Sequence, residues 1–151
     1  MVEGIVRIIA PGVAPPGGHY AHAVAHGGQL FISGQLPIAP DGRHRIDASF
    51  ADQARQAITN LLAIAEAGGS DRDHFMKVTA YIVGVDNWPT FNAVFAEIMG
   101  DARPARAIVP VPELHHGYLV EVDGVGAIPG VDVGTLTSAH SRQTRPRSGA
   151  S

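Results

Sequence analysis

The chain of 151 residues contains no cysteine, which excludes disulfide bonds, thiolate metal ligands and a cysteine nucleophile. It also lacks any run of about 18 apolar residues, the length that a membrane-spanning helix needs. No basic segment followed by an apolar stretch marks a secretory signal at the N-terminus. We therefore expect a cytoplasmic protein with no membrane partner.

Charged residues are scarce as well, at 17% of the chain, against about 25% in an average soluble protein. Lys77 is the single lysine among the 11 basic residues. A surface with so little charge favours burial of part of it against other copies of the chain. Hydrophobic residues make up 45%, which is enough for one core, and the length corresponds to one domain.

The few charges are unevenly distributed along the chain. From Ser138 onward the sequence carries three arginines and no acid, so the rest has eight basic and 14 acidic residues, a balance of -6. The C-terminal stretch has no apolar periodicity, and we expect a folded domain over residues 1–129 and a disordered tail over residues 130–151. The acidic body opposes nonspecific binding to nucleic acid.

Six segments have the alternation or the β-branched composition that is typical of strands. The predicted strands span residues 4–9, 20–25, 29–33, 76–83, 105–111 and 118–128. The sequence His26-Gly27-Gly28 separates the second from the third and predicts a hairpin turn, because glycine adopts positive φ at little cost.

Two amphipathic segments predict helices. Over residues 47–67 apolar side chains recur every three or four positions, and Ser49 followed by Asp52 is an N-cap signal. A second helix begins with Pro89 in its first turn and ends at Gly100.

The order of elements is three strands, a helix, a strand, a helix and two strands. This order predicts an α+β two-layer sandwich, in which a mixed six-stranded sheet carries both helices on one face. We expect Tyr81, Val83 and Ile108 on the opposite face, which is then too apolar to face water. Another subunit is the natural cover for such a face.

Ionisable residues inside the predicted strands mark the candidate site. Strand alternation places Val120 and Val122 on the helix face, and Glu121 and Asp123 on the other. A carboxylate there either faces solvent or belongs to a site where burial raises its pKa and suits it to acid/base chemistry. Arg106, in the preceding strand, needs an anion. That anion is either one of these two carboxylates, in a structural salt bridge, or the carboxylate of a substrate.

The histidines do not follow a metal-binding pattern. His19, His22 and His26 lie in a strand and turn, where a spacing of three or four does not bring side chains together, and His115 and His116 are adjacent. Loop or pocket-lining roles are favoured for them. Neither a phosphate-binding glycine loop nor a nucleophile elbow is present. We therefore expect neither a metal nor an organic cofactor.

Five separated blocks resemble the RidA (YjgF) family of imine/enamine deaminases, and they are SGQLPIAPDG, QARQAITNLLAIAEAGGS, KVTAYIV, PARAIVPV and VEVDGVGAI. The blocks stand in family order, and the resemblance covers residues 5–129. It implies a chorismate mutase-like fold and a homotrimer with the sheets inside, the helices outside and active sites between subunits. The segments GHYAHAV and LHHG are similar to the branch that includes 2-aminomuconate deaminases.

The resemblance also implies roles for single residues. It makes Arg106 the group that binds the substrate's carboxylate and Glu121 the group that positions or activates the hydrolytic water. It adds four residues at the substrate, which are Tyr20, Ser33, Gly34 and Asn92. Ile108 stands where many members have cysteine, and its backbone carbonyl is expected to face the water. From the residues alone, Tyr20 also suits a core position, Ser33 a strand-end hydrogen bond and Asn92 an exposed helix position.

The implied reaction is hydrolysis of a C=N bond, which converts a 2-imino or enamino acid to a 2-keto acid and ammonia without a cofactor. Three alternatives stay open: a 2-aminomuconate-type deaminase, an endoribonuclease that inhibits translation, and a noncatalytic trimer that binds small ligands. The sequence does not interleave basic and aromatic residues as RNA-binding surfaces do, which disfavours the second of these.

Overall fold

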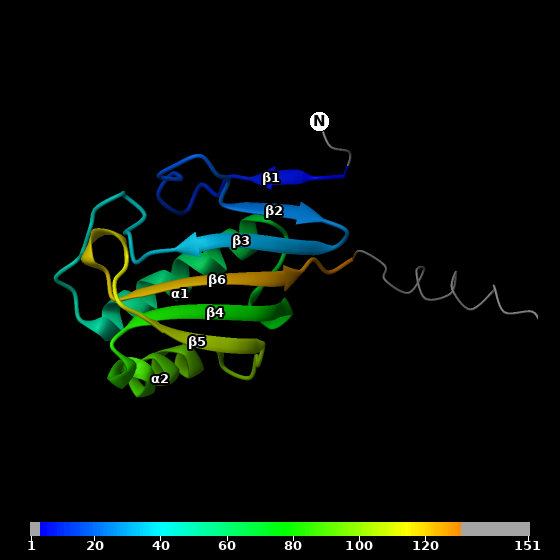
Figure 1. Ribbon diagram of the computed structural model, residues 1–151. Helices are drawn as coiled ribbons and strands as arrows, with labels where there is room; N and C mark the ends of the chain where they lie inside the picture. The colour runs from blue at the N-terminus through cyan, green and yellow to red at the C-terminus, as the bar shows by residue number, and fades with distance from the viewer. Residues whose placement is uncertain (1–3, 131–151) are drawn as a thin grey trace, which may run out of the picture.

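A mixed sheet of six strands, with two helices packed on one face, forms the core of the computed structural model, which describes residues 4–130 (Figure 1). The strands are β1 (Val6–Ile8), β2 (Ala23–His26), β3 (Gln29–Gln35), β4 (Phe75–Val83), β5 (Ala105–Val111) and β6 (Val120–Ala127). The helices are α1 (Phe50–Ala67) and α2 (Trp88–Met99). The predicted α+β sandwich is confirmed. The tail predicted for residues 130–151 falls, apart from its first residue, outside the described part of the chain.

The strands lie in the order β1-β2-β3-β6-β4-β5. All neighbours are antiparallel except β4 and β5, which are parallel and are connected through α2. The last strand, β6, is therefore inserted between β3 and β4, and β4 separates it from β5 (Figure 1). Among the helices within residues 4–130, none has the length and hydrophobicity to cross a membrane.

The turn between β2 and β3 is the predicted hairpin. His26 pairs with Gln29, so Gly27 and Gly28 alone form the loop, with φ values of 59° and 78°. Two successive residues at positive φ are what a type I′ turn requires, and glycine adopts them without a Cβ clash.

Helix α1 begins three residues later than predicted. Ser49 takes a non-helical backbone conformation (φ -59°, ψ 156°), and its hydroxyl accepts a hydrogen bond from the Asp52 N–H at 3.1 Å. The predicted N-cap is therefore correct, and it is the cap itself that sets the helix start at Phe50. Residues 47 and 48 precede the cap and lie outside the helix.

Two buried amides on α1 fasten loops to the helix. Gln53 donates to the carbonyls of Ile46 (3.2 Å) and Ala48 (3.0 Å) and accepts from the Leu119 N–H (2.9 Å). Seven residues further on, Asn60 donates to the carbonyl oxygens of two residues in the loop after β3, at 3.1 and 2.9 Å. Because a buried amide without partners is costly, these bonds hold the loops on both sides of the cavity described below.

The sheet face opposite the helices is open and partly apolar. Phe31 is 47% exposed there and Val109 38%. The placement of Ile108 on this face was wrong: β5 pairs with β4 in a register that sets Ile108 beside Ala80, and its side chain packs against the helix-side core. The segment is apolar on both faces, so its sequence pattern did not determine which side chains point to the helices.

Candidate active site

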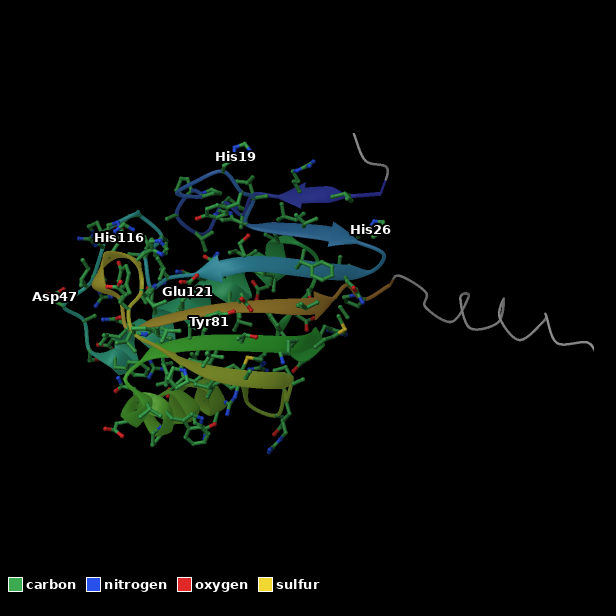
Figure 2. The ribbon with its side chains drawn as sticks, viewed as in Figure 1. His19, His26, Asp47, Tyr81, His116 and Glu121 are labelled. Atoms are coloured by element: carbon green, nitrogen blue, oxygen red, sulfur yellow. The ribbon has the colours of Figure 1, made fainter. Side chains whose placement is uncertain are left out.

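A cavity of about 570 Å³ opens at one end of the sheet. Its walls come from residues 13–17 of the first loop, the end of β3, residues 36–44, and β6. Five of the side chains that line it carry a hydroxyl, imidazole or carboxyl group, and these are Tyr20, Ser33, His44, His115 and Glu121. We call it the Glu121 cavity. Figure 2 shows Glu121 on the sheet face that carries no helix.

Glu121 lies directly against the backbone of Gly34. The pairing of β3 with β6 shifts between Ile32 and Gln35, so Gly34 sits in an irregular step of the ladder. A Cβ atom at position 34 would overlap the Glu121 Oε1 atom. The absence of a side chain at position 34 therefore makes the space that the carboxyl group occupies.

The surroundings of Glu121 favour its protonated form. Burial raises the pKa of this carboxyl, the charge of His115 lowers it, and the charge of Asp123 raises it again, with the pKa above its ordinary value as the outcome. A carboxyl whose pKa is raised exchanges its proton closer to neutral pH, which suits general acid/base chemistry.

A tyrosine and a second carboxyl stand beside Glu121 on the same face. Tyr81 of β4 is the cross-strand partner of Glu121 (Figure 2). Its hydroxyl donates to the Asp123 Oδ2 atom at 3.1 Å. Burial first, and then this bond, raise the pKa of Tyr81. The bond keeps Asp123 in place as the negative neighbour of Glu121.

Tyr20 and Ser33 offer complementary hydrogen-bonding groups to the cavity. The Tyr20 hydroxyl accepts from the Gly17 N–H at 3.1 Å, which leaves its proton available to a ligand. The Ser33 hydroxyl donates to the Ala21 carbonyl at 2.7 Å, which leaves its lone pairs available. Tyr20 is not a core aromatic, since half of its surface is exposed.

His22 holds the first loop in place and is not free to bind a metal. Its Nδ1 accepts from the Ala10 N–H at 2.9 Å, and its Nε2 lies 2.9 Å from the Ala14 carbonyl. A carbonyl can only accept, so Nε2 carries the proton and both ring nitrogens are used. Figure 2 places His19 and His26 far apart, and within residues 4–130 no group of three or more metal-binding side chains converges.

Arg106 lies away from the Glu121 cavity, on the helix side of β5. Its register partner on β4 is Val78, which is buried beneath the helices. The guanidinium donates to Asn92 Oδ1 at 3.0 Å, and its central carbon lies 4.9 Å from the Phe95 ring centre and 5.9 Å from that of Trp88. These contacts hold the group, and within residues 4–130 the bond to Asn92 is the one hydrogen bond that the guanidinium donates.

The structural salt bridge considered for Arg106 is absent from residues 4–130. No carboxylate there pairs with Arg106. Glu121 and Asp123 lie on the opposite face of the sheet, and β4 stands between their strand and β5. The interpretation of either acid as its partner within one chain was wrong, because strand order is not visible in the sequence.

One chain therefore carries the predicted site as two separate halves. Tyr20, Ser33, Gly34 and Glu121 meet in the Glu121 cavity. Arg106 and Asn92 line a second hollow of about 370 Å³ near α2, which we call the Arg106 hollow. Ile108 is among the lining residues of neither.

Several residues that build the cavity were not singled out from the sequence. They are His44 and Asn60, which line it, and Gln53 and Tyr118, which fasten the neighbouring loops. A signal for the two amides was available, because Gln53 and Asn60 are seven residues apart and interrupt the buried stripe of α1. Nothing in the local pattern points to His44, whose contacts come from a segment more than 70 residues away.

Replacing Gly34 with alanine is expected to displace the Glu121 carboxyl, because the new Cβ would take its place. Overpacking of this kind costs about 1–3 kcal/mol of folding free energy. The pKa of Glu121 should move back toward its ordinary value as the carboxyl leaves its half-buried position. Carbon-detected NMR titration of the carboxyl and thermal unfolding measure the two effects.

Gly12→Ala is the matched control, since a Cβ at position 12 meets nothing within 4 Å. It should leave both quantities unchanged. An unchanged Glu121 titration in Gly34→Ala would show that the close approach does not position the carboxyl.

Comparison with known proteins places the chain in a family. A family model described as Endoribonuclease L-PSP matches residues 12–128. A RutC family protein of Pyrococcus horikoshii is 36% identical over 110 residues, which are 73% of this chain and 87% of that protein. The 2-iminobutanoate/2-iminopropanoate deaminase of Dermatophagoides farinae is 33% identical over 123 residues, 81% and 96% of the two chains.

A solved structure has the same fold. Escherichia coli TdcF with bound serine superimposes with a TM-score of 0.76 at 27% identity, over 81% of this chain and 98% of that one. The chain thus belongs to the Endoribonuclease L-PSP family, which is the RidA (YjgF) family that its motifs indicated. Its relatives include a protein named as an imine deaminase and a protein named only as a RutC family member.

Proposed function

We propose that the protein is a hydrolytic deaminase of 2-imino and 2-enamino acids, releasing ammonia and a 2-keto acid. The observation that carries the proposal is a half-buried carboxyl of raised pKa, Glu121, that lines a cavity together with the hydroxyls of Tyr20 and Ser33. The deaminase name of the mite relative supports the reaction. The serine bound to TdcF, a small molecule with a carboxylate, supports the class of ligand.

The proposed working unit is a homotrimer in which Arg106 and Asn92 of one copy complete the Glu121 cavity of the next. Within one chain the two halves lie on opposite faces of the sheet, so a ligand in the cavity needs a carboxylate clamp from elsewhere. The open face, with Phe31 and Val109 exposed, offers apolar surface for the contact. A head-to-tail interface that closes after three copies would form three equal sites.

In the proposed mechanism Arg106 grips the substrate's carboxylate in a two-pronged hydrogen bond and so fixes the C2 atom relative to water. An enamine first tautomerises to the imine. The Glu121 carboxylate then takes a proton from water as its oxygen adds to C2, and it passes this proton to the nitrogen to give a carbinolamine. It next takes the proton of the new C2 hydroxyl and passes it to the nitrogen, and the C–N bond breaks to release ammonia. The resulting carbonyl at C2 is that of the 2-keto acid. We assign the Ile108 backbone carbonyl to accept from the same water.

Neither a metal nor an organic cofactor enters this scheme, because one carboxyl, one guanidinium and water carry every step. Tyr20 supplies a proton donor and Ser33 an acceptor, which together orient the imine nitrogen and the water. Gly34 leaves the space that Glu121 occupies, and in this proposal its backbone N–H faces the substrate.

The description of the family model names an endoribonuclease, and the charge of the cavity does not favour that activity here. The one carboxyl in its lining is that of Glu121, and the described lining contains no lysine or arginine. Binding of an RNA backbone depends on several cationic contacts to phosphate. The balance of -6 outside the C-terminal stretch adds to the repulsion.

Ammonia and 2-keto acid release test the proposal directly. Imines of several 2-amino acids are generated in the assay by an amino-acid oxidase, and the purified protein is expected to accelerate their hydrolysis over the spontaneous rate. Light scattering should report three copies. Assembly without acceleration for any imine would favour a noncatalytic ligand-binding trimer, and cleavage of added RNA would favour a nuclease.

A further inference from the structure

A tyrosine and an aspartate on the open sheet face lie next to Glu121 but outside both cavities. Asp123 follows Glu121 by two residues on β6, so the two side chains leave the same face of the sheet. Tyr81 pairs with Glu121 across β4 and β6, and Figure 2 shows the two residues on these neighbouring strands. Neither Tyr81 nor Asp123 lines the Glu121 cavity or the Arg106 hollow. Any part that they take in a reaction there therefore acts through Glu121.

The bond between Tyr81 and Asp123 holds the carboxylate without neutralising its charge. The Tyr81 hydroxyl donates to Asp123 Oδ2 at 3.1 Å, and a hydroxyl is a neutral donor. Within residues 4–130 no lysine, arginine or histidine forms an ion pair with Asp123. This includes Lys77, which alternation places on the same face of β4. Asp123 thus keeps its negative charge and is held in one position.

The distance and the burial of the two carboxyls allow that charge to act on Glu121. Residues two apart on a strand are about 7 Å apart. Glu121 and Asp123 are both half-buried, so water screens their interaction less than it does on an exposed surface. A like charge disfavours ionisation of its neighbour. The pKa of Glu121 agrees with this geometry, since burial raises it, the charge of His115 lowers it and the charge of Asp123 raises it further.

The other titratable groups around Glu121 come from the walls of its cavity. They are Tyr20 from the first loop, His44 from the loop after β3, and His115 from the 3-10 turn η3 (His115–Gly117). Five exposed residues of both signs lie on the loops of these two histidines but line neither cavity, and they are Asp41, Arg43, Arg45, Asp47 and Glu113. Two opposed charges therefore act on Glu121, the negative one from Asp123 and the positive one from His115.

We propose that Tyr81 and Asp123 are positioning residues for the reaction at Glu121: Tyr81 holds the charge of Asp123 beside Glu121, and this charge makes Glu121 a stronger base toward the hydrolytic water. The inference rests on the proposed function, in which Glu121 takes a proton from that water. Neither residue touches the substrate. Cover of the open face by another copy excludes water from it and strengthens the interaction between the two carboxyls.

Asp123→Asn tests the charge, because asparagine keeps the shape and an oxygen that accepts from Tyr81. We expect the pKa of Glu121 to fall toward its ordinary value, since the carboxylate form loses a repulsive neighbour. The rise of kcat with pH should move to lower pH by the same amount. Carbon-detected NMR titration of the full-length protein and initial rates of ammonia release measure the two shifts. Asp101→Asn is the matched control, because it removes the same charge from an exposed position after α2 and should move neither.

Three further variants separate the charge from a role in packing. Asp123→Glu keeps the charge and should keep most of the wild-type titration of Glu121. Tyr81→Phe frees the carboxylate and should move the titration in the same direction as Asp123→Asn, but less far. In the Asp123→Asn background Tyr81→Phe should add nothing, because the two residues act as one unit. His115→Gln removes the opposing charge and should move the titration to higher pH.

The failure of this inference and the failure of the proposed function give different results. An unchanged Glu121 titration in Asp123→Asn, or equal shifts in Asp123→Asn and Asp101→Asn, would overturn the inference while ammonia release stands. A shifted titration in a protein that releases ammonia from no imine would keep the coupling of Asp123 to Glu121 and overturn the deaminase. A shifted titration with an unshifted pH profile of kcat would show that the charge does not act on the base of the reaction.

Discussion

Replacement of Arg106 by alanine is expected to reduce the deamination of carboxylated imines to the spontaneous rate while the assembly survives. The guanidinium has no carboxylate partner within residues 4–130, so its removal leaves no orphaned charge behind. What is lost is a charge-assisted clamp on the substrate. Misplacement of a reacting group by about 1 Å already costs about 10²-fold, and loss of the clamp should cost at least as much.

Initial rates of ammonia release measure this effect, and light scattering checks the assembly. Arg55→Ala is the matched control, because Arg55 pairs with Glu97 at 3.1 Å on the surface. Arg106→Lys keeps the positive charge but cannot form the two parallel hydrogen bonds of a guanidinium, and it should recover only part of the rate. Normal turnover in purified Arg106→Ala would show that the clamp assignment is wrong.

Local patterns predicted the elements of this fold well, because each depends on near neighbours in the chain. The two-glycine hairpin, the Ser49 cap and the proline in the first turn of α2 each satisfy a local backbone requirement. Alternation also placed Val120 and Val122 correctly beneath the helices. The one error of boundary in α1 amounts to three residues at the cap.

Local patterns did not predict which side chains of β5 point to the helices and which point to the open face of the sheet. Its sequence ARAIVPV is apolar on both faces, so alternation does not say whether Ile108 or Val109 points to the helices. The order of strands is also non-local: β6 lies between β3 and β4 through pairings over long sequence distances. The contact of Arg106 depends on the face to which β5 turns this side chain and on the order of the strands. For this reason Arg106 contacts Asn92 and neither Glu121 nor Asp123.

The register of β5 and the order of the strands also explain why the predicted site lies in two separate halves within one chain. Motif resemblance assigns roles to Arg106 and Glu121 but does not say on which face of the sheet each lies. The register of β5 and the order of the sheet set the two residues on opposite faces. For this physical reason the proposed function requires more than one copy of the chain.

Replacement of Glu121 by glutamine is expected to lower kcat by about 10²–10⁴-fold, the contribution of a positioned acid/base group. Glutamine keeps the shape of the side chain but takes no proton from water. In the wild type, kcat should rise with pH through the raised pKa of Glu121, because the ionised form is the base. The glutamine variant should lose this limb of the pH profile.

The contribution of Glu121 to folding stability should fall with rising pH, in contrast to kcat, which should rise. The pKa of Glu121 is raised in the folded protein, so the folded state gains from protonation at low pH. This contribution is lost as pH rises through the folded pKa, because the charged carboxylate is then held half-buried. Above that pH, Glu121→Gln should unfold at a temperature at least equal to that of the wild type. A large drop in melting temperature there would show that Glu121 stabilises the fold.

Mixing the two inactive variants separates an intersubunit site from a site within one chain. If Arg106 of one copy serves Glu121 of the next, a trimer reassembled from equal amounts of Arg106→Ala and Glu121→Gln contains restored sites. A site is intact when its arginine comes from a Glu121→Gln copy and its glutamate from an Arg106→Ala copy, which random assembly gives in about a quarter of sites. Activity should therefore return to about a quarter of the wild-type rate. If both groups act within one chain, each copy lacks one of them and mixing restores nothing.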